Sequence, residues 1–421
     1  MEYKFCSSFQ DWDAWIGLGL SLSPSHTATY FSSVGIALRL LCGRSDDPTK
    51  AMSAVSSLRS RSRVAFDNVD YPPIPADLLK YLAASTDGTV QSAWASDDVE
   101  LRRQLSRLLG LVLENEISFF RGFWQVAQWL ALNLRSERNA SVAFSCFEPE
   151  GFVIPFANSL KARGFRPQLL PLDDRFDPRI ELLGQSKTRG PMLFLISLVQ
   201  PVTGRIVKAD EVIKVVHDLG GLVVADATHY VQRLSPSLGA IDADLTLVRS
   251  RPLLAPEGVV LAYLSRRMRE MLKMDADASV SWHNMSSLDS PTEMVMPLVE
   301  SIKFLASVAG RRRTEFEHNR AILDGLKDLS AVSVIGPGEV TDRVAIFTLE
   351  VSGLQPSEVA LMLDSAANLT VSAGKTGMGS SNACLRYPEP GAIRASPFLS
   401  NTEADVEAFI DAMRIIAASA V

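Results

Sequence analysis

Cysteine and histidine are scarce in this chain of 421 residues, which has four cysteines and five histidines. Cys6, Cys42, Cys146 and Cys384 form no Cys-x-x-Cys pair, so their spacing indicates neither a disulfide framework nor a zinc site. A reducing cytoplasm fits this cysteine usage best. The sequence also lacks an apolar run long enough to span a bilayer, and it opens without a basic segment followed by an apolar one. We therefore expect neither secretion nor membrane insertion.

An excess of positive charge is also absent, since 42 Lys and Arg face 48 Asp and Glu, for a formal net charge of -6. This balance disfavours nucleic-acid binding, because neutralising phosphates needs Lys and Arg clustered on one face. Two short basic runs, at 59–63 and 311–313, have no aromatic residues between their arginines and are expected on the solvated surface. With 47% hydrophobic residues, a chain of this length can bury a sizeable core in two or more globular units.

Short apolar runs bounded by Gly, Pro or Asp recur in the middle of the chain, at 141–147, 191–199, 221–228 and 243–250. Their length and apolar character are typical of strands that helices cover on both faces. Helical stretches at 152–164 and 208–221 separate them, and each ends in glycine, as a left-handed C-cap prefers. The alternation predicts a three-layer α/β domain with a mainly parallel sheet.

Both ends of the chain have a different pattern. A helix is predicted at 29–41, a long helix at 301–329, a strand at 344–353 and a further helix at 356–367. The last helix should begin at a capping box made by Thr402 and Asp405. We expect residues 1–70 and 308–421 to build a small α+β domain, and residues 71–307 to form the large α/β domain.

Two blocks of motifs lie a domain apart. The first, from Leu193 to Gly258, contains a strand ending Asp-Ala-Thr-His (226–229) and then a loop ending Ala-Pro-Glu-Gly (255–258); the second is IRASPFLSNTEADVEAFIDAM (393–413). Together they resemble the class V aminotransferase and cysteine desulfurase superfamily, with its fold-type-I pyridoxal phosphate scaffold. The resemblance implies the three-layer large domain, the small domain and a dimer.

The resemblance makes Asp226 and Arg394 the main candidates for residues of the functional site. An acidic residue at the carboxyl end of a strand lies where ligands bind in open α/β sheets. In this superfamily such an aspartate pairs with the pyridine nitrogen of the cofactor, although Asp226 could instead cap the next helix or turn. Arg394 matches the arginine that grips a substrate carboxylate, and the alternative for it is a domain-interface salt bridge.

The loop that should carry the Schiff-base lysine departs from the superfamily pattern. Aligning residues 255–258 on the usual Gly-Pro-x-Gly puts Pro252 at the lysine position and Arg251 at the preceding histidine. A guanidinium stays protonated and is not a usable nucleophile for an imine. The sequence therefore predicts no covalently bound cofactor.

Other contacts have changed too. In the loop that binds the cofactor phosphate in the superfamily, Trp124 is expected to fill the space of the phosphate group. Desulfurases also have a cysteine in a mobile loop; here that position falls at Gly377, and Cys384 lies some residues later. Lys375 lies in that same loop but belongs to the other domain. The resemblance places the remaining cofactor or substrate contacts at Arg121, Gly122, Glu148, Gln200 or Pro201, and Ser290, the last in a segment that contacts the neighbouring subunit.

Three hypotheses follow. The first is a repurposed enzyme that acts on a small amino-acid-like or carboxylate metabolite, with Asp226 and His229 as an acid–base pair and with Arg251, Arg394, Glu148 and Trp124 shaping the site. His229 could equally be a hydrogen-bonded interior side chain. The second is a non-catalytic partner subunit in a homodimer or heterodimer. The third is a lyase or transferase that binds pyridoxal phosphate non-covalently through Asp226, against which the bulk of Phe120 and Trp124 counts.

Addition of pyridoxal phosphate followed by borohydride reduction tests the lysine argument. We expect an unchanged intact mass and no bound chromophore, because residue 252 offers no amine. A cofactor mass fixed to the chain would overturn that expectation and restore a conventional mechanism.

Overall fold

The computed structural model describes residues 63–86, 98–111, 116–134, 140–185, 192–272, 282, 292–308, 311–375 and 391–420. The expected helix at 29–41 and the candidate Ser290 lie outside this range. None of the helices in the described part of the chain combines the length and the apolarity needed to cross a bilayer.

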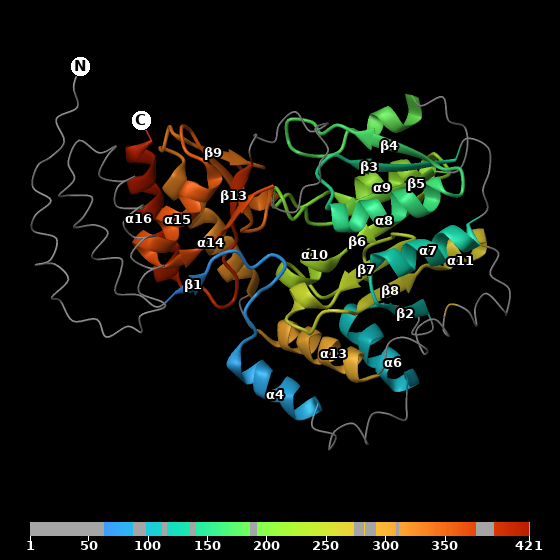
Figure 1. The fold of residues 1–421 in the computed structure, drawn as a ribbon. Helices are drawn as coiled ribbons and strands as arrows, with labels where there is room; N and C mark the ends of the chain where they lie inside the picture. Colours follow the sequence, from blue (N-terminus) through green and yellow to red (C-terminus); the bar gives the residue numbers. More distant parts are fainter. Residues whose placement is uncertain are drawn as a thin grey trace, which may run out of the picture.

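A seven-stranded sheet forms the centre of the large domain (Figure 1). Its neighbouring strands are parallel except around β8, which runs antiparallel to both β2 and β7. The α/β class and mainly parallel sheet predicted from the sequence are thereby confirmed. In spatial order the strands are β2 (Ile117–Phe120), β8 (Val260–Leu264), β7 (Leu245–Arg249), β6 (Leu222–Asp226), β5 (Met192–Ser197), β3 (Ser141–Ser145) and β4 (Arg166–Leu170).

Successive side chains of the central strands enter two separate cores, as the two-residue period of a strand requires. In β6, Leu222 and Val224 pack on one face of the sheet, while Val223 and Ala225 pack on the other. Helices therefore cover both faces and make three layers. The helices of one face are α7 (Phe123–Asn133), α8 (Glu150–Lys161) and α11 (Arg266–Leu272), and those of the other are α4 (Ala76–Thr86), α6 (Asp98–Leu109), α9 (Ala209–Asp218), α10 (Thr228–Arg233) and α13 (Thr292–Ser307).

The four predicted apolar strands correspond to β3, β5, β6 and β7, and the two helical stretches between them correspond to α8 and α9. Both helices are followed by a glycine with positive φ, at Gly164 (89°) and Gly220 (75°). A side chain would be strained in this left-handed conformation, which explains why glycine closes each helix.

The small domain has an antiparallel four-stranded sheet packed against three helices. The capping box predicted at its last helix is present, because Thr402 Oγ1 accepts from Asp405 N and Asp405 Oδ2 accepts from Thr402 N. The strands, in order, are β12 (Ser372–Gly374), β13 (Ala392–Ala395), β10 (Phe347–Val351) and β9 (Val332–Ile335), and the helices are α14 (Arg311–Leu326), α15 (Pro356–Ala367) and α16 (Glu403–Ser419).

Two expectations for the region after Glu300 need correction. The single helix predicted at 301–329 is two helices, because α13 ends at Ser307 and α14 begins at Arg311. Gly310, a poor helix former, lies between them in the sequence. Arg311 is also buried rather than solvated, and it faces the carboxylate of Glu315.

Residues 63–75, which we call the N-terminal strap, connect the two domains (Figure 1). Strand β1 (Val64–Ala65) pairs in parallel with β11 (Leu369–Thr370) of the small domain. Asn68 Nδ2 donates to Asn401 Oδ1 at 2.8 Å, and Gln232 Nε2 on the large domain donates to the carbonyl oxygen of Asn68 at 3.2 Å. The strap is therefore hydrogen-bonded to both domains where it passes between them.

A buried ion pair joins α10 to α14 nearby. Arg233 Nη1 lies 3.0 Å from Glu315 Oε1 and also donates to the carbonyl oxygen of Pro397. The same Glu315 oxygen accepts from Ala345 N at 2.7 Å. The hydrogen bonds compensate for the burial of both charges, so loss of either partner leaves an uncompensated buried charge.

We expect Arg233→Met to lower the free energy of unfolding by about 3–5 kcal/mol, because it removes the guanidinium that is hydrogen-bonded to the buried carboxylate of Glu315. Urea denaturation measures this change. Arg266→Met is the matched control, since Arg266 pairs with Glu270 on the exposed surface and should cost about 1 kcal/mol or less. Equal effects of the two substitutions would contradict the importance of the buried pair.

Candidate functional site

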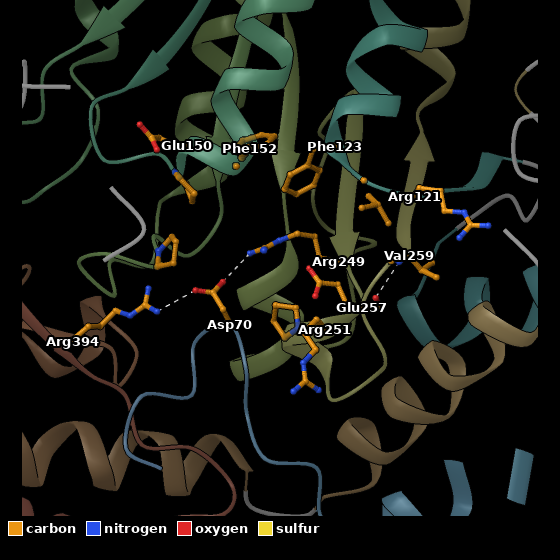
Figure 2. Close-up of a pocket in the computed structure, with 18 of the residues that line it drawn as sticks. Asp70, Arg121, Phe123, Glu150, Phe152, Arg249, Arg251, Glu257, Val259 and Arg394 are labelled. Carbon is orange, nitrogen blue, oxygen red and sulfur yellow. Dashed lines mark hydrogen bonds and ion pairs between the residues drawn. The ribbon is translucent and has the colours of Figure 1, made fainter. Parts of the chain in front are cut away.

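A cavity of about 460 Å³ lies at the carboxyl ends of the large-sheet strands, against the strap and the small domain (Figure 2). This is the edge at which open α/β sheets bind ligands. Charged residues from both domains and from the strap reach it. The lining consists of Asp70, Arg121, Gly122, Phe123, Pro149, Glu150, Gly151, Phe152, Pro201, Arg249, Ser250, Arg251, Pro252, Glu257, Gly258, Val259, Val260, Lys375 and Arg394.

Asp70 stands between two arginines in the middle of this lining (Figure 2). Its Oδ1 is 3.4 Å from Arg249 Nη2, at the end of β7, and its Oδ2 is 3.1 Å from Arg394 Nη2, on β13. Burial opposes ionisation of the Asp70 carboxyl, but its neighbours His229, Arg394 and Arg249 outweigh this and hold its pKa below the usual range. Asp70 is therefore a carboxylate at neutral pH.

Arg394 has carboxylate partners within the chain. Its Nε donates to both oxygens of Asp67, at 3.1 and 3.0 Å, in addition to the contact of Nη2 with Asp70. The guanidinium is buried, although the residue lines the cavity. Arg394 was expected either to bind a substrate carboxylate or to form a salt bridge between domains. The contacts seen here are a salt bridge between β13 of the small domain and the N-terminal strap.

Asp226 lies at the end of β6 as predicted, buried below the cavity lining. Its Oδ1 accepts from Thr228 N at 2.9 Å and from the Thr228 hydroxyl, so it caps the turn that leads into α10, whose N-cap residue is Ala227. It is not among the described residues that line the cavity. The contacts of Asp226 are therefore those expected if it caps the following helix or turn.

His229 is buried one turn further along, and its Nδ1 is 2.9 Å from Gln232 Oε1. Because the Gln232 amide nitrogen donates to the carbonyl oxygen of Pro252 at 2.8 Å, Gln232 Oε1 is the acceptor and His229 Nδ1 carries the proton. His229 Nε2 has no hydrogen-bond partner among the described residues. Burial, and then the charge of Arg249, lower the pKa of His229 to about 4, so the imidazole is neutral at neutral pH.

Glu148 and Gln200 are also buried at this edge rather than in the cavity wall. Glu148 accepts from Ser197 N at 2.9 Å, from Ser197 Oγ at 2.5 Å and from Ser145 Oγ at 3.1 Å. Burial nevertheless raises the pKa of Glu148 to about 7, and the nearby charge of Asp226 adds to the rise. Gln200 Oε1 accepts from the Thr203 hydroxyl at 2.8 Å. These polar groups form a buried layer under the cavity.

Cys146, two residues before Glu148, is disulfide-bonded. The spacing of the four cysteines does not predict this bond.

The start of α7 brings Arg121, Gly122 and Phe123 to the cavity. The expectation that Trp124 fills this space does not hold, because Trp124 is 53% exposed and lies outside the lining of the cavity. Its indole instead packs over Gly122, where a Cβ would lie 3.0 Å from Trp124 Cδ1. Phe123 contributes the aromatic wall, with the Arg249 guanidinium 5.6 Å from its ring centre.

Pro252 lines the cavity within a short 3-10 helix, Arg251–Leu253. Arg251 lies 5.3 Å from the ring centre of Tyr71 on the strap. Lys375, expected to belong to the other domain, reaches the same cavity from the small-domain loop after β12. Asp70, Arg249 and Glu257 were not predicted as site residues.

Pyridoxal phosphate can be tested against these residues. Arg121, Arg249 and Arg251 suit an anionic group. Pro252 supplies no amine at the position expected for an imine, and Asp226 does not reach the lining to face a pyridine nitrogen. The described residues thus fit an anion but do not fit this cofactor held at residue 252.

Residues 83–409 match the family model described as aminotransferase class-V. A probable cysteine desulfurase of Aeropyrum pernix is 21% identical over 330 residues, which are 72% of this chain and 79% of that protein. A cysteine desulfurase of Gluconacetobacter diazotrophicus is 26% identical over 334 residues, covering 74% and 80%. The apo structure of a cysteine desulfurase from Thermococcus onnurineus NA1 has a TM-score of 0.71 at 18% identity, covering 86% of this chain and 98% of that one, and supports the fold.

The pKa of Glu148 predicts a pH dependence of stability. Because it is raised from 4.5 to about 7 in the folded protein, its stabilising contribution is complete below 4.5 and is lost as the pH rises through 7. Glu148→Gln cannot ionise, so it should lose less stability than the wild type between about pH 5 and about pH 8, by a few kcal/mol.

Urea denaturation at both pH values measures the difference between wild type and Glu148→Gln. Glu270→Gln, on the exposed surface, is the control and should follow the wild type. Parallel curves for Glu148→Gln and wild type would show that Glu148 does not titrate in this range.

Proposed function

Because this chain belongs to the aminotransferase class-V family, we propose that it acts on a small amino-acid-like carboxylate in the described cavity, without an imine at residue 252. The supporting observation is the excess of positive charge in the lining, where the arginines and Lys375 outnumber Asp70, Glu150 and Glu257. Four arginines, Arg121, Arg249, Arg251 and Arg394, come from four different elements and meet at one cavity. Convergence of this kind suits a small anion that has several hydrogen-bond acceptors.

The arginines would bind and orient the ligand. Arg394 and Arg249 are held by Asp67 and Asp70, so their guanidinium planes are fixed before a ligand arrives. Arg251, over the exposed ring of Tyr71, has no such carboxylate contact among the described pairs. We therefore assign to Arg251 the larger share of the attraction for a carboxylate.

Proton transfer within the cavity is assigned to neither Asp226 nor His229 directly, since both lie beneath its lining. Their proposed role is to keep a neutral imidazole and a fixed carboxylate under the ligand. An acid–base step by the pair would require its opening toward the cavity. The dimer, as homodimer or heterodimer, is likewise part of the proposal, because Ser290, its expected contributor, lies outside the described residues.

Reversal of one lining charge tests the proposal. Arg251→Glu should weaken binding of small carboxylates and amino acids by about tenfold or more, because it puts repulsion where attraction was. Ligand-observed NMR with a panel of L-amino acids and their 2-oxo acids measures affinity, and mass spectrometry of the mixture detects any product.

Arg320→Glu is the matched control, since the Arg320 guanidinium also lies over an aromatic ring, at 4.7 Å from Phe316, but outside the lining. It makes the same change in net charge and should leave binding unchanged. Absence of binding to the wild type across the panel would refute the proposed function and favour a non-catalytic partner subunit.

A further inference from the structure

Asp70 is an acidic side chain that lies between two arginines of the cavity lining, to which Glu150 and Glu257 also belong. The strap fixes its place, because the carbonyl oxygens of both preceding residues, Asn68 and Val69, accept from Gln232 Nε2. Asn68 is held further by Asn401 on the small domain. The Asp70 carboxylate is thus a built component of the site, at a position set by both domains.

The charges around Asp70 balance. Asp67 and Asp70 are paired with Arg394 and Arg249, which gives two negative and two positive groups in mutual contact. His229, which lies close enough to influence Asp70, is neutral at neutral pH. A ligand carboxylate placed at Arg394 would therefore meet the charge of Asp70 and gain little net attraction.

Asp70 nevertheless has capacity for another partner. Each of its oxygens has one arginine contact, whereas a carboxylate offers about four acceptor positions. Its side chain is 31% exposed and lines the cavity, in contrast to that of Asp67, which is buried and outside the lining. The remaining acceptor positions suit an N–H donor that carries positive charge.

Resting on the proposed function, we infer that Asp70 binds the protonated amine of the ligand, so that the cavity selects a zwitterionic amino acid over the corresponding 2-oxo acid. The carboxylate of the ligand is then bound by Arg121 and Arg251 rather than by the two arginines that Asp70 contacts. In Figure 2, Arg121 lies on the far side of Arg249 from Asp70, so these two side chains belong to different parts of the lining. Asp70 is a specificity-determining residue in this arrangement.

The wild type gives the first test and needs no variant. Matched pairs of probes differ only at the amine: L-alanine and pyruvate, L-aspartate and oxaloacetate, L-glutamate and 2-oxoglutarate. Isothermal titration calorimetry at neutral pH should show tighter binding of the amino acid by about tenfold or more in at least one pair, as expected for a charge-assisted hydrogen bond.

Asp70→Asn then tests the residue. It keeps the size of the side chain and one acceptor oxygen but loses the charge, so the ratio of amino acid to 2-oxo acid affinity should fall by about tenfold or more. Asp67→Asn is the matched control, because it removes the other carboxylate from Arg394 without changing the lining. It should keep the wild-type ratio even if both affinities shift.

The outcomes separate the two proposals. Preference of the wild type for the 2-oxo acid, or an unchanged ratio in Asp70→Asn, overturns the role of Asp70 while the proposed function stands. Failure of the wild type to bind any member of the panel overturns both. The inference is supported if Asp70→Asn loses the preference for the amino acid over the 2-oxo acid while Asp67→Asn keeps it.

Discussion

The ion pairs of Asp70 with Arg249 and Arg394 are the interaction on which the site depends. Each member comes from a different part of the chain: the strap, the end of β7 in the large sheet and β13 in the small domain. The relative position of the two domains therefore determines the distances between these charges. A cavity with its charges so arranged is already organised for a ligand, which reduces the ordering needed on binding.

Beneath these charges lies a layer of buried polar groups that owes its stability to hydrogen bonds. Glu148 has three donors from Ser145 and Ser197, and Asp226 has two from Thr228. Burial still determines the protonation of Glu148 and His229, with the first tending to be protonated and the second neutral. Net charge is thereby kept low under the arginines, as the cost of desolvating ions requires.

Much of this architecture follows from local sequence. The apolar runs predict β3, β5, β6 and β7, and Thr402 with Asp405 predicts the start of α16, because strand burial and helix capping depend on nearby residues. Asp226 and Arg251 were likewise found from motif spacing, and their roles stay predictions. Asp70 and Arg249 were missed, since their significance arises only from contact between distant segments. Trp124 was wrongly predicted to fill the cavity for a related reason: the sequence gives the size of a side chain but not its orientation.

The strap also has a consequence for the order in which the molecule can be assembled. Asn68 and Asn401, which hold it in place, are 333 residues apart, and Asp70 and Arg394 are 324 apart. Contacts of such high sequence separation form late, because closing a long loop costs entropy before the contact repays it. On a ribosome, the large sheet could form while its binding cavity still lacked one wall. Ligand binding would therefore report that synthesis and domain closure are complete, and a shortened chain could fold in part without gaining the site.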